Sequence, residues 1–328
     1  MSATDELVAE PRGSAPSASD LGSGGGAGDQ VFKVVTLAAG LAVLLVLALI
    51  AYSTTKEAWP AFKAEGLSFI TSSDWSPANN QFGALAFIYG TALTAFIAIL
   101  LAVPVSLGIA LFTNEAAPRR IRKVIVYVMD LLAAIPSVVY GLWGILVFAP
   151  NVVHVYQWIA DRTDGMPVLG SIFGGNAAGK SFMTAGIILA IMITPIVTSL
   201  SREVIATVPS MQREAAYGMG ATRWETIRQA VLPASRGGIV GAVMLGLGRA
   251  MGETIAAALV IGSSAQITSH VFYPGDSMPA VIANQFGEAG GLQRSALIGL
   301  GVVLFIVTII VNVLARGIVG RMDRRLVA

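Results

Sequence analysis

The sequence predicts an all-α membrane protein with six transmembrane helices. Of its 328 residues, 55% are hydrophobic and only 12% are charged, and the mean hydropathy is +0.74. Soluble domains carry about 25% charged residues. Long apolar stretches recur along the chain, and a backbone in hydrocarbon must satisfy its own hydrogen bonds, so each stretch is expected to be a helix. We therefore expect one transmembrane domain, residues 31–328.

The N-terminal segment, residues 1–30, is rich in Gly, Ser, Ala and acidic side chains. Such a composition cannot bury a core, so we expect a disordered cytoplasmic tail. The segment is longer and more acidic than the basic start of a signal peptide. The apolar stretch that follows is therefore expected to remain as a membrane anchor.

Six apolar stretches reach the roughly 17–25 residues that a helix needs to cross a bilayer. They are Val34–Tyr52, Ala84–Phe112, Val124–Phe148, Phe182–Ser201, Gly238–Ile261 and Ala296–Ala315. Pro104, Pro136 and Pro195 lie inside the second, third and fourth stretches. Because proline removes a backbone hydrogen bond, each of these three helices is expected to bend.

The distribution of Lys and Arg predicts the side of the membrane on which each loop lies. One side carries thirteen: Arg119, Arg120, Arg122, Lys123, Arg202, Arg213, Arg223, Arg228, Arg236, Arg316, Arg321, Arg324 and Arg325. The longer loops of the other side carry five: Lys56, Lys63, Arg162, Lys180 and Arg294. Basic residues accumulate in cytoplasmic loops, so both termini are expected in the cytoplasm.

The stretch GGNAAGKS, Gly174–Ser181, matches the phosphate-cradling pattern G-x-x-x-x-G-K-[ST]. The charge distribution places it in an outer loop, where ATP is absent, and no clear strand precedes it. The run Val124–Asp130, which ends in an acid as a magnesium-binding strand does, falls inside the third span. We interpret the match as chance. The chain has no Cys, and its two His lie outside the apolar stretches, so no metal site is expected.

The longest loop assigned to the cytoplasm, Glu203–Gly238, has the pattern of a helical hairpin. Pro209 suits the start of a helix, and Met211–Met219 contains good helix formers. Gly220 is typical of the position just after a helix end.

A second short helix is indicated by the sequence TRWE. Thr222 and Glu225 have the spacing of a capping box, and Pro233 is expected to end this helix. A hairpin without its own core must pack on its own transmembrane domain or dock a cytoplasmic partner. The residues alone leave both interpretations open.

Arg249 and Glu253 lie near the middle of the fifth span, four residues apart and therefore adjacent on a helix. An arginine at the bilayer centre costs roughly 2.5–3.5 kcal/mol, so the pair should face protein or water. Arg249 can neutralise Glu253 in a structural pair or bind an anion with its planar fork of donors, and both can hold if the pair opens during transport. Gly246, Gly248 and Gly252 allow close helix packing, so this span is expected at the centre of the bundle.

The loop resembles the EAA loop of ABC-importer permeases, the inner-membrane components of binding-protein-dependent transport. That family has E-A-A-x-x-x-G followed nine residues later by I-x-L-P, and this sequence has EAAYGMG and then AVLP, with Ala230 in place of the usual Ile. The resemblance implies a type I permease fold. It also implies that the elements coupling to an ATPase are Glu214, Ala215, Ala216, Gly220, Leu232 and Pro233.

Three further stretches, IPSVVYGLWG, MITPIVTSLSREV and GRAMGET, are similar to phosphate-importer permeases, and to their C-type subunit more than to its A-type partner. The similarity covers approximately residues 30–328. It implies that Arg249 and Glu253 lie on a phosphate pathway. The weaker candidates are Ser137, Tyr140, Thr194 and Thr198, hydroxyls that often bond only their own backbone. Asp130 is the other charge inside a predicted span.

The resemblance also implies partners. We expect a second permease subunit of the A type, two ATPase subunits that bind ATP and Mg, an extracytoplasmic phosphate-binding protein and surrounding membrane lipid. A homodimer stays open. We expect no cofactor in this chain, no enzymatic activity of its own and no nucleic-acid partner. The expected location is a bacterial plasma membrane, which the chain crosses several times.

The outer loops are expected to receive the binding protein. They span residues 53–83, 149–181 and 262–294, and they contain Trp59, Trp75 and Phe272. Anchoring of these rings at the membrane interface is the alternative.

Three other functions were weighed. An ion-gradient-driven secondary phosphate transporter should show a carboxylate relay and repeated halves, and it would leave the hairpin unexplained. A membrane enzyme or scaffold would need a catalytic set, but the sequence contains no HExxH or GxSxG motif. An ABC permease for another oxyanion, such as sulfate or molybdate, would share the hairpin but is not expected to contain GRAMGET.

Overall fold

The computed structural model describes the backbone of residues 27–327 and the side chains of residues 28–317. The expected tail therefore lies outside the described residues, except that residues 27–30 are helical. The chain divides after Tyr52 into two units: the first holds the N-terminal part of the first helix, and the second holds all later elements.

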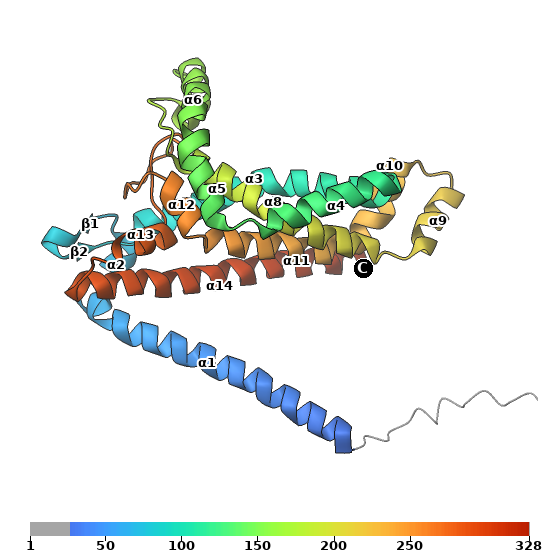
Figure 1. Cartoon of the computed structure of the whole chain (residues 1–328), viewed down its shortest axis with the longest axis horizontal. Helices are drawn as coiled ribbons and strands as arrows, with labels where there is room; N and C mark the ends of the chain where they lie inside the picture. Colours follow the sequence, from blue (N-terminus) through green and yellow to red (C-terminus); the bar gives the residue numbers. More distant parts are fainter. Residues whose placement is uncertain (1–26, 328) are drawn as a thin grey trace, which may run out of the picture. The chain divides into compact units, whose positions relative to one another are not determined.

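In the part of the chain that the structure describes, helices are joined by loops, and one two-stranded antiparallel sheet is present (Figure 1). Its elements are α1 (Ala27–Glu65), α2 (Ser68–Thr71), β1 (Trp75–Ser76), η1 (Pro77–Asn79), β2 (Gln81–Phe82), α3 (Leu85–Leu111), η2 (Phe112–Ala116), α4 (Arg119–Ala134), α5 (Ser137–Trp143), η3 (Gly144–Phe148), α6 (Ala149–Thr163), α7 (Leu169–Phe173), α8 (Phe182–Ala206), α9 (Ser210–Gly218), α10 (Arg223–Thr226), η4 (Ile227–Val231), α11 (Leu232–Met251), α12 (Ile255–Val260), α13 (Met278–Gln285) and α14 (Gly291–Val327).

Six helices among the described residues are long and apolar enough to cross a bilayer, which confirms the predicted number. They are Gly28–Glu65, Leu85–Ala116, Ser137–Thr163, Phe182–Ala206, Arg223–Met251 and Gly291–Gly317. The first, second, fourth and sixth contain or closely overlap the predicted stretches. The third and fifth differ in ways that affect the site.

The predicted third span is wrong in its boundaries. Pro136 does not bend a helix there but separates two of them, because the residue before a proline is driven out of the α conformation. Ile135 is extended, with φ −68° and ψ 126°, and α4 ends before it. The candidate span begins only at Ser137. Asp130 consequently lies on α4, a separate helix without a buried residue.

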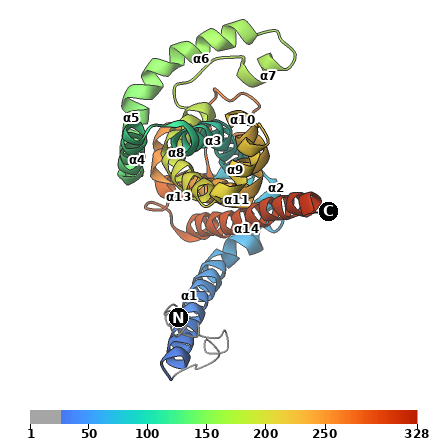
Figure 2. The same cartoon turned by 90° about the vertical axis from the view of Figure 1, so that its right-hand side faces the viewer.

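Helix α8 forms the centre of the second unit. It packs against α3 on one side and α11 on the other, and the view in Figure 2 shows these three helices grouped together. Two glycines of α11 make the approach to α8 possible: a Cβ at Gly238 would overlap Val204, and one at Gly246 would overlap Val197. Close packing through small residues is a common way to hold membrane helices together.

The two ends of the second unit have different structures (Figure 1). We call the end that holds α9 and α10 the hairpin end, and the end that holds β1, β2 and α13 the loop end. At the loop end, the segment between α12 and α13 packs so closely against α3 and α8 that an added methyl group would overlap its neighbours. A Cβ at Gly90 would overlap the Asp276 carbonyl oxygen, and one at Gly275 would overlap the Phe182 ring.

A buried acid lies in this loop-end packing. The Asp276 side chain is only 5% exposed, and its Oδ1 accepts a hydrogen bond from the Ser277 amide at 2.8 Å. Burial disfavours the charged form and raises the pKa of Asp276 to about 7. The carboxyl group can therefore take up a proton near neutral pH instead of requiring a buried cation.

The three aromatic residues singled out in the expected outer loops differ in their exposure. Phe272 is 2% exposed and stacks on Tyr156 with ring centroids 4.4 Å apart. The Trp75 indole N–H donates to Gln285 Oε1 at 3.0 Å. Trp59 is 61% exposed. Phe272 is thus part of the interior, and this burial fits neither contact with a binding protein nor anchoring of the ring at the membrane interface.

Substitution of Gly90 by Ala tests the packing of the loop end. The new methyl group would overlap backbone, which cannot move aside as a flexible side chain can, so we expect Gly90→Ala to lower the free energy of unfolding by about 1–3 kcal/mol. Gly108→Ala in the same helix is the control, because no atom lies within 4 Å of its added Cβ. Thermal unfolding in detergent measures both, and equal melting temperatures would contradict this packing.

Candidate functional site

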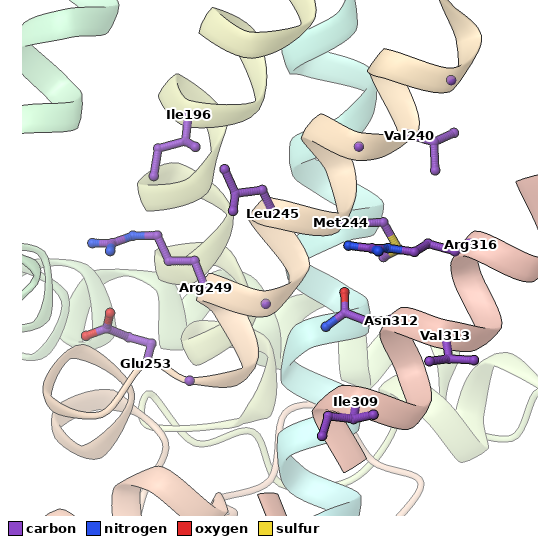
Figure 3. A pocket seen from close by; sticks show the side chains of 14 residues that line it. Ile196, Val240, Met244, Leu245, Arg249, Glu253, Ile309, Asn312, Val313 and Arg316 are labelled. Carbon is purple, nitrogen blue, oxygen red and sulfur yellow. The ribbon is translucent and has the colours of Figure 1, made fainter. Parts of the chain in front are cut away.

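A groove of about 1290 Å³ runs between α11 and α14. Figure 3 shows the side chains of both helices around it, with Ile196 contributed by α8. The α11 wall contains Gly237, Gly241 and Gly248, and no atom lies within 4 Å of the Cβ that each of them lacks. This face of α11 is therefore open among the described residues, whereas the face with Gly238 and Gly246 is closed by α8.

The predicted pair Arg249 and Glu253 lines the groove, but the two residues do not share one continuous helix. Helix α11 ends at Met251, and Glu253 follows the break. Glu253 is 8% exposed, and its Oε1 accepts a hydrogen bond from the Ala256 amide at 3.3 Å, in the first turn of α12. The expected i, i+4 geometry is therefore wrong.

Arg249 has no carboxylate partner among the described residues. Its Nη2 lies 3.9 Å from the Met192 sulfur, a weak acceptor. Both Arg249 and Glu253 extend to the same side of α11 (Figure 3). The interpretation of a closed structural pair is not what the structure shows, and the guanidinium donors of Arg249 remain available in the groove.

The sequence analysis missed two polar residues of the groove, Asn312 and Arg316 of α14. We counted Arg316 only as a basic residue beyond the last span. The overlooked signal is the spacing: Asn312 interrupts the sixth apolar stretch, and Arg316 follows four residues later, on the same helix face. The Asn312 amide donates to the Thr308 carbonyl at 2.9 Å.

The polar side chains of the groove favour an anion. The lining residues include two guanidinium groups, of Arg249 and Arg316, and one carboxylate, that of Glu253. Each guanidinium carries five N–H donors in a geometry that matches oxyanions. The groove walls are otherwise apolar, which strengthens electrostatic interactions within it.

The four weaker candidates do not line the groove. The Tyr140 hydroxyl donates to the Leu132 carbonyl at 2.8 Å, and the Thr194 hydroxyl donates to the Ala190 carbonyl at 2.7 Å. Ser137 starts α5. Thr198 is buried, and its hydroxyl has no hydrogen-bond partner among the described residues.

Asp130 lies apart from the groove as well. It borders a cavity of about 10 Å³ together with Thr198 and Arg202. A cavity of this size is no larger than one water molecule requires. The structure therefore does not bring Asp130 together with Arg249.

The hairpin has the turn and cap that the sequence predicts. Helix α9 ends at Gly218, and Gly220 has φ +84°, a conformation that favours glycine. The Thr222 hydroxyl accepts a hydrogen bond from the Glu225 amide at 3.4 Å, and the Thr222 amide donates to Glu225 Oε2 at 2.8 Å. The capping box is confirmed.

The second hairpin helix does not end at Pro233, contrary to our expectation. Helices α10, η4 and α11 form one continuous helix, Arg223–Met251. The π-helical turn Ile227–Val231 precedes the proline, and the Leu232 amide bonds the Ile227 carbonyl, five residues back. This wider turn accommodates the proline ring, which clashes with the preceding turn of a regular α-helix. Leu232 and Pro233 consequently lie within the helix that leads to Arg249.

The hairpin presents apolar side chains to its surroundings. Met219 is 84% exposed, Met211 74% and Trp224 63%. In α9 only Ala216 is buried, while Glu214 and Ala215 are exposed. An exposed surface of this kind is typical of a docking site for another protein.

The GGNAAGKS segment does not form a phosphate cradle. The element before it is the short helix α7, and several amides of the segment are already bonded within the protein. The Ala178 amide donates to the Phe272 carbonyl at 2.9 Å, and the Ser181 amide donates to the Val260 carbonyl at 3.1 Å. The Ser181 hydroxyl caps α8 by accepting from the Thr184 amide.

Comparison with known sequences gives close relatives. The profile of the family described as "Binding-protein-dependent transport system inner membrane component" matches residues 102–328. The chain is 45% identical over 299 residues to the phosphate transport system permease protein PstC of Mesorhizobium japonicum, with 90% of this chain and 91% of that protein covered. It is 44% identical over 297 residues to PstC of Haemophilus influenzae, with 90% and 94% covered.

Solved structures share the fold. A chain of a bacterial alginate ABC transporter, crystallised in complex with an alginate pentasaccharide-bound periplasmic protein, superposes with a TM-score of 0.60 at 17% identity. The match covers 90% of this chain and 97% of that chain. At this identity the likeness shows the fold alone, which is that of an ABC-importer permease.

The hairpin turn is tested by Gly220→Ala. A Cβ in the left-handed conformation costs roughly 1–2 kcal/mol, so we expect amides of α9 and α10 to exchange with deuterium about tenfold faster than in the unaltered chain. Gly218→Ala is the matched control, since Gly218 lies in α9 and its added Cβ meets nothing within 4 Å. Equal exchange in the two variants would contradict the turn described above.

Proposed function

The chain belongs to the binding-protein-dependent transport system inner membrane components, and from this premise we infer that it is the permease subunit of an ATP-driven importer of inorganic phosphate. It is a multi-pass membrane protein of the inner membrane. The relatives named as phosphate transport permeases, at 44% and 45% identity, support phosphate as the substrate. The cationic groove supports an oxyanion independently of those names.

One observation carries the mechanism: the helix Arg223–Met251 starts in the exposed hairpin and ends beside the charged groove. At about 1.5 Å per residue it extends about 40 Å. A partner that displaces the hairpin therefore moves Arg249 without an intervening joint. The transport subunit needs no ATPase site of its own when a docked ATPase supplies this displacement.

In the proposed cycle, Arg249 donates hydrogen bonds to phosphate oxygens in the groove. Glu253 lies two residues beyond the end of α11 and repels the same anion, which keeps the binding weak enough for release. Movement of α11 relative to α14 changes the distance between Arg249 and Arg316, and so changes the binding strength during the cycle.

We propose that partner subunits complete the importer. A second permease subunit covers the open face of α11 and closes the groove into a pathway. Two ATPase subunits, which hold ATP and Mg, dock on the hairpin through Glu214, Ala215, Ala216 and Gly220. A phosphate-binding protein delivers substrate at the loop end. Both termini then lie in the cytoplasm.

Two alternative functions would require different features of the structure. A secondary phosphate transporter needs no docking hairpin, so the exposed apolar residues of α9 and α10 would have no purpose. A permease for another oxyanion could use the same guanidinium groups, and competition by sulfate against phosphate uptake distinguishes it.

The function is tested with the chain reconstituted in vesicles together with its partners. We expect phosphate uptake that requires ATP, and we expect Arg249→Ala to lower it at least about tenfold, because hydrogen bonds to a charged group contribute about 1.5–3 kcal/mol. Arg236→Ala, on the same helix but outside the groove, should leave uptake unchanged. Uptake driven by an ion gradient without ATP, or normal uptake by an assembled Arg249→Ala complex, contradicts the proposal.

The sidedness of the hairpin is tested by cysteine labelling, which the absence of natural cysteine makes simple. Met219→Cys lies at an 84% exposed position of the hairpin, and Val168→Cys at a 67% exposed position before α7. In intact cells whose outer surface is accessible, we expect a membrane-impermeant maleimide to label the second variant and to reach the first only after permeabilisation. The reverse pattern would place the hairpin outside and remove the ATPase from the mechanism.

A further inference from the structure

An ion pair joins the hairpin to the second span. Arg213 Nη2 lies 3.1 Å from Glu115 Oε1, and this is the salt bridge found among the described residues. Arg213 precedes the Glu214-Ala215-Ala216 segment on α9, whereas Glu115 lies in η2, the π-helical turn that ends the second span. The Glu115 side chain is 8% exposed and that of Arg213 is 21% exposed, so solvent screens the pair only in part.

Arg213 binds a third element at the same time. Its Nη1 donates to the Val208 carbonyl at 2.8 Å, and its Nη2 donates to the Ile205 carbonyl at 2.9 Å. The Ile205 carbonyl lies in the last turn of α8, and Val208 follows the C-cap residue of that helix, Thr207. Carbonyls at a helix end lack the amide partners that they would have inside the helix. Arginine suits this position because one planar group can reach a carboxylate and two carbonyls together.

A second set of hydrogen bonds supports the same junction. The Asn114 side-chain amide donates to the Arg202 carbonyl of α8 at 2.7 Å. Arg122 of α4 donates through Nη2 to the Asn114 carbonyl at 2.8 Å. Thus η2 is tied to α4, α8 and α9 at the hairpin end. We call these four side chains, Asn114, Glu115, Arg122 and Arg213, the clasp.

The clasp matters because α9 has few other attachments to the bundle. Only Ala216 of α9 is buried, and the covalent chain links the hairpin to the fourth and fifth spans alone. The second span and α4 can follow the hairpin only through noncovalent contacts. The clasp also borders a cavity of about 270 Å³ lined by polar groups, which leaves room for the side chains to change position.

We propose that Glu115 and Arg213 are positioning residues of transport, which transmit the displacement of the hairpin to the second span and α4. This proposal rests on the proposed function, since it requires a partner that moves the hairpin. With the clasp closed, α3, α4 and α8 turn together with α9. With it open, η2 and α4 follow the hairpin only through their packing against α8, and ATP is consumed with less phosphate carried.

The test uses the complete complex in vesicles and measures phosphate imported per ATP hydrolysed. Glu115→Gln removes the charge and keeps the shape of the side chain. We expect this ratio to fall at least about fivefold, the lower end of usual coupling between sites, while ATP hydrolysis continues. Glu203→Gln is the control, because Glu203 is exposed near the same end of α8 and has no ion pair among the described residues.

A second variant, Arg213→Lys, keeps the charge but cannot reach Glu115 and the carbonyls of Ile205 and Val208 at once. This variant should also lower the amount of phosphate imported per ATP. It provides the test of the proposal if the Glu115→Gln complex does not assemble. If the assembled variants import as much phosphate per ATP as the unaltered complex, the proposal is overturned. It is also overturned if the variants have a lower melting temperature or fewer bound partners while the phosphate imported per ATP is unchanged. Failure of the unaltered complex to import phosphate with ATP would instead contradict the proposed function.

Discussion

Hydrocarbon offers a polypeptide backbone no hydrogen-bond partner, so a helix that carries movement from water into a membrane must stay bonded along its length. Pro233 threatens that continuity, since it lacks an N–H and its ring clashes with the preceding turn. The π-helical turn Ile227–Val231 removes the conflict by widening the helix just before the proline. The exposed hairpin and the charged groove depend on this turn, because it makes them two ends of the same rigid element.

The sequence was a good guide wherever a signal was local. Hydropathy located the spans, and the T-x-x-E spacing and Gly220 located the hairpin cap and turn, because each depends on neighbouring residues only. The boundaries of the third span were predicted wrongly because a proline in an apolar stretch is compatible with a bend and with a break. Only the packing of α4 as a separate helix shows that the helix breaks at this proline. Glu253 was expected on the same helix as Arg249 because nothing within GRAMGET indicates that the helix ends at Met251.

Contacts between distant segments could not be predicted from one sequence. Arg316 joins Arg249 at the groove only because α14 lies against α11. Glu115 and Arg213 are 98 positions apart, and neither has a neighbour in sequence that suggests the other. Charge counting predicts one membrane side for Arg213 and Arg316, which is a collective property, but it could not assign them individual partners.

The glycine contacts on α8 have a mechanical consequence. Gly238 and Gly246 hold the helix Arg223–Met251 against Val204 and Val197, and the centre of these two contacts lies past the middle of the helix. A rigid rod supported there is a lever with unequal arms, about 28 Å toward the hairpin and about 10 Å toward Arg249 at about 1.5 Å per residue. The short arm travels about a third as far as the long one and in the opposite direction, with a correspondingly larger force. In the proposed cycle, a wide movement of the hairpin relative to α8 thereby becomes a small, strong displacement of one guanidinium group inside the bilayer.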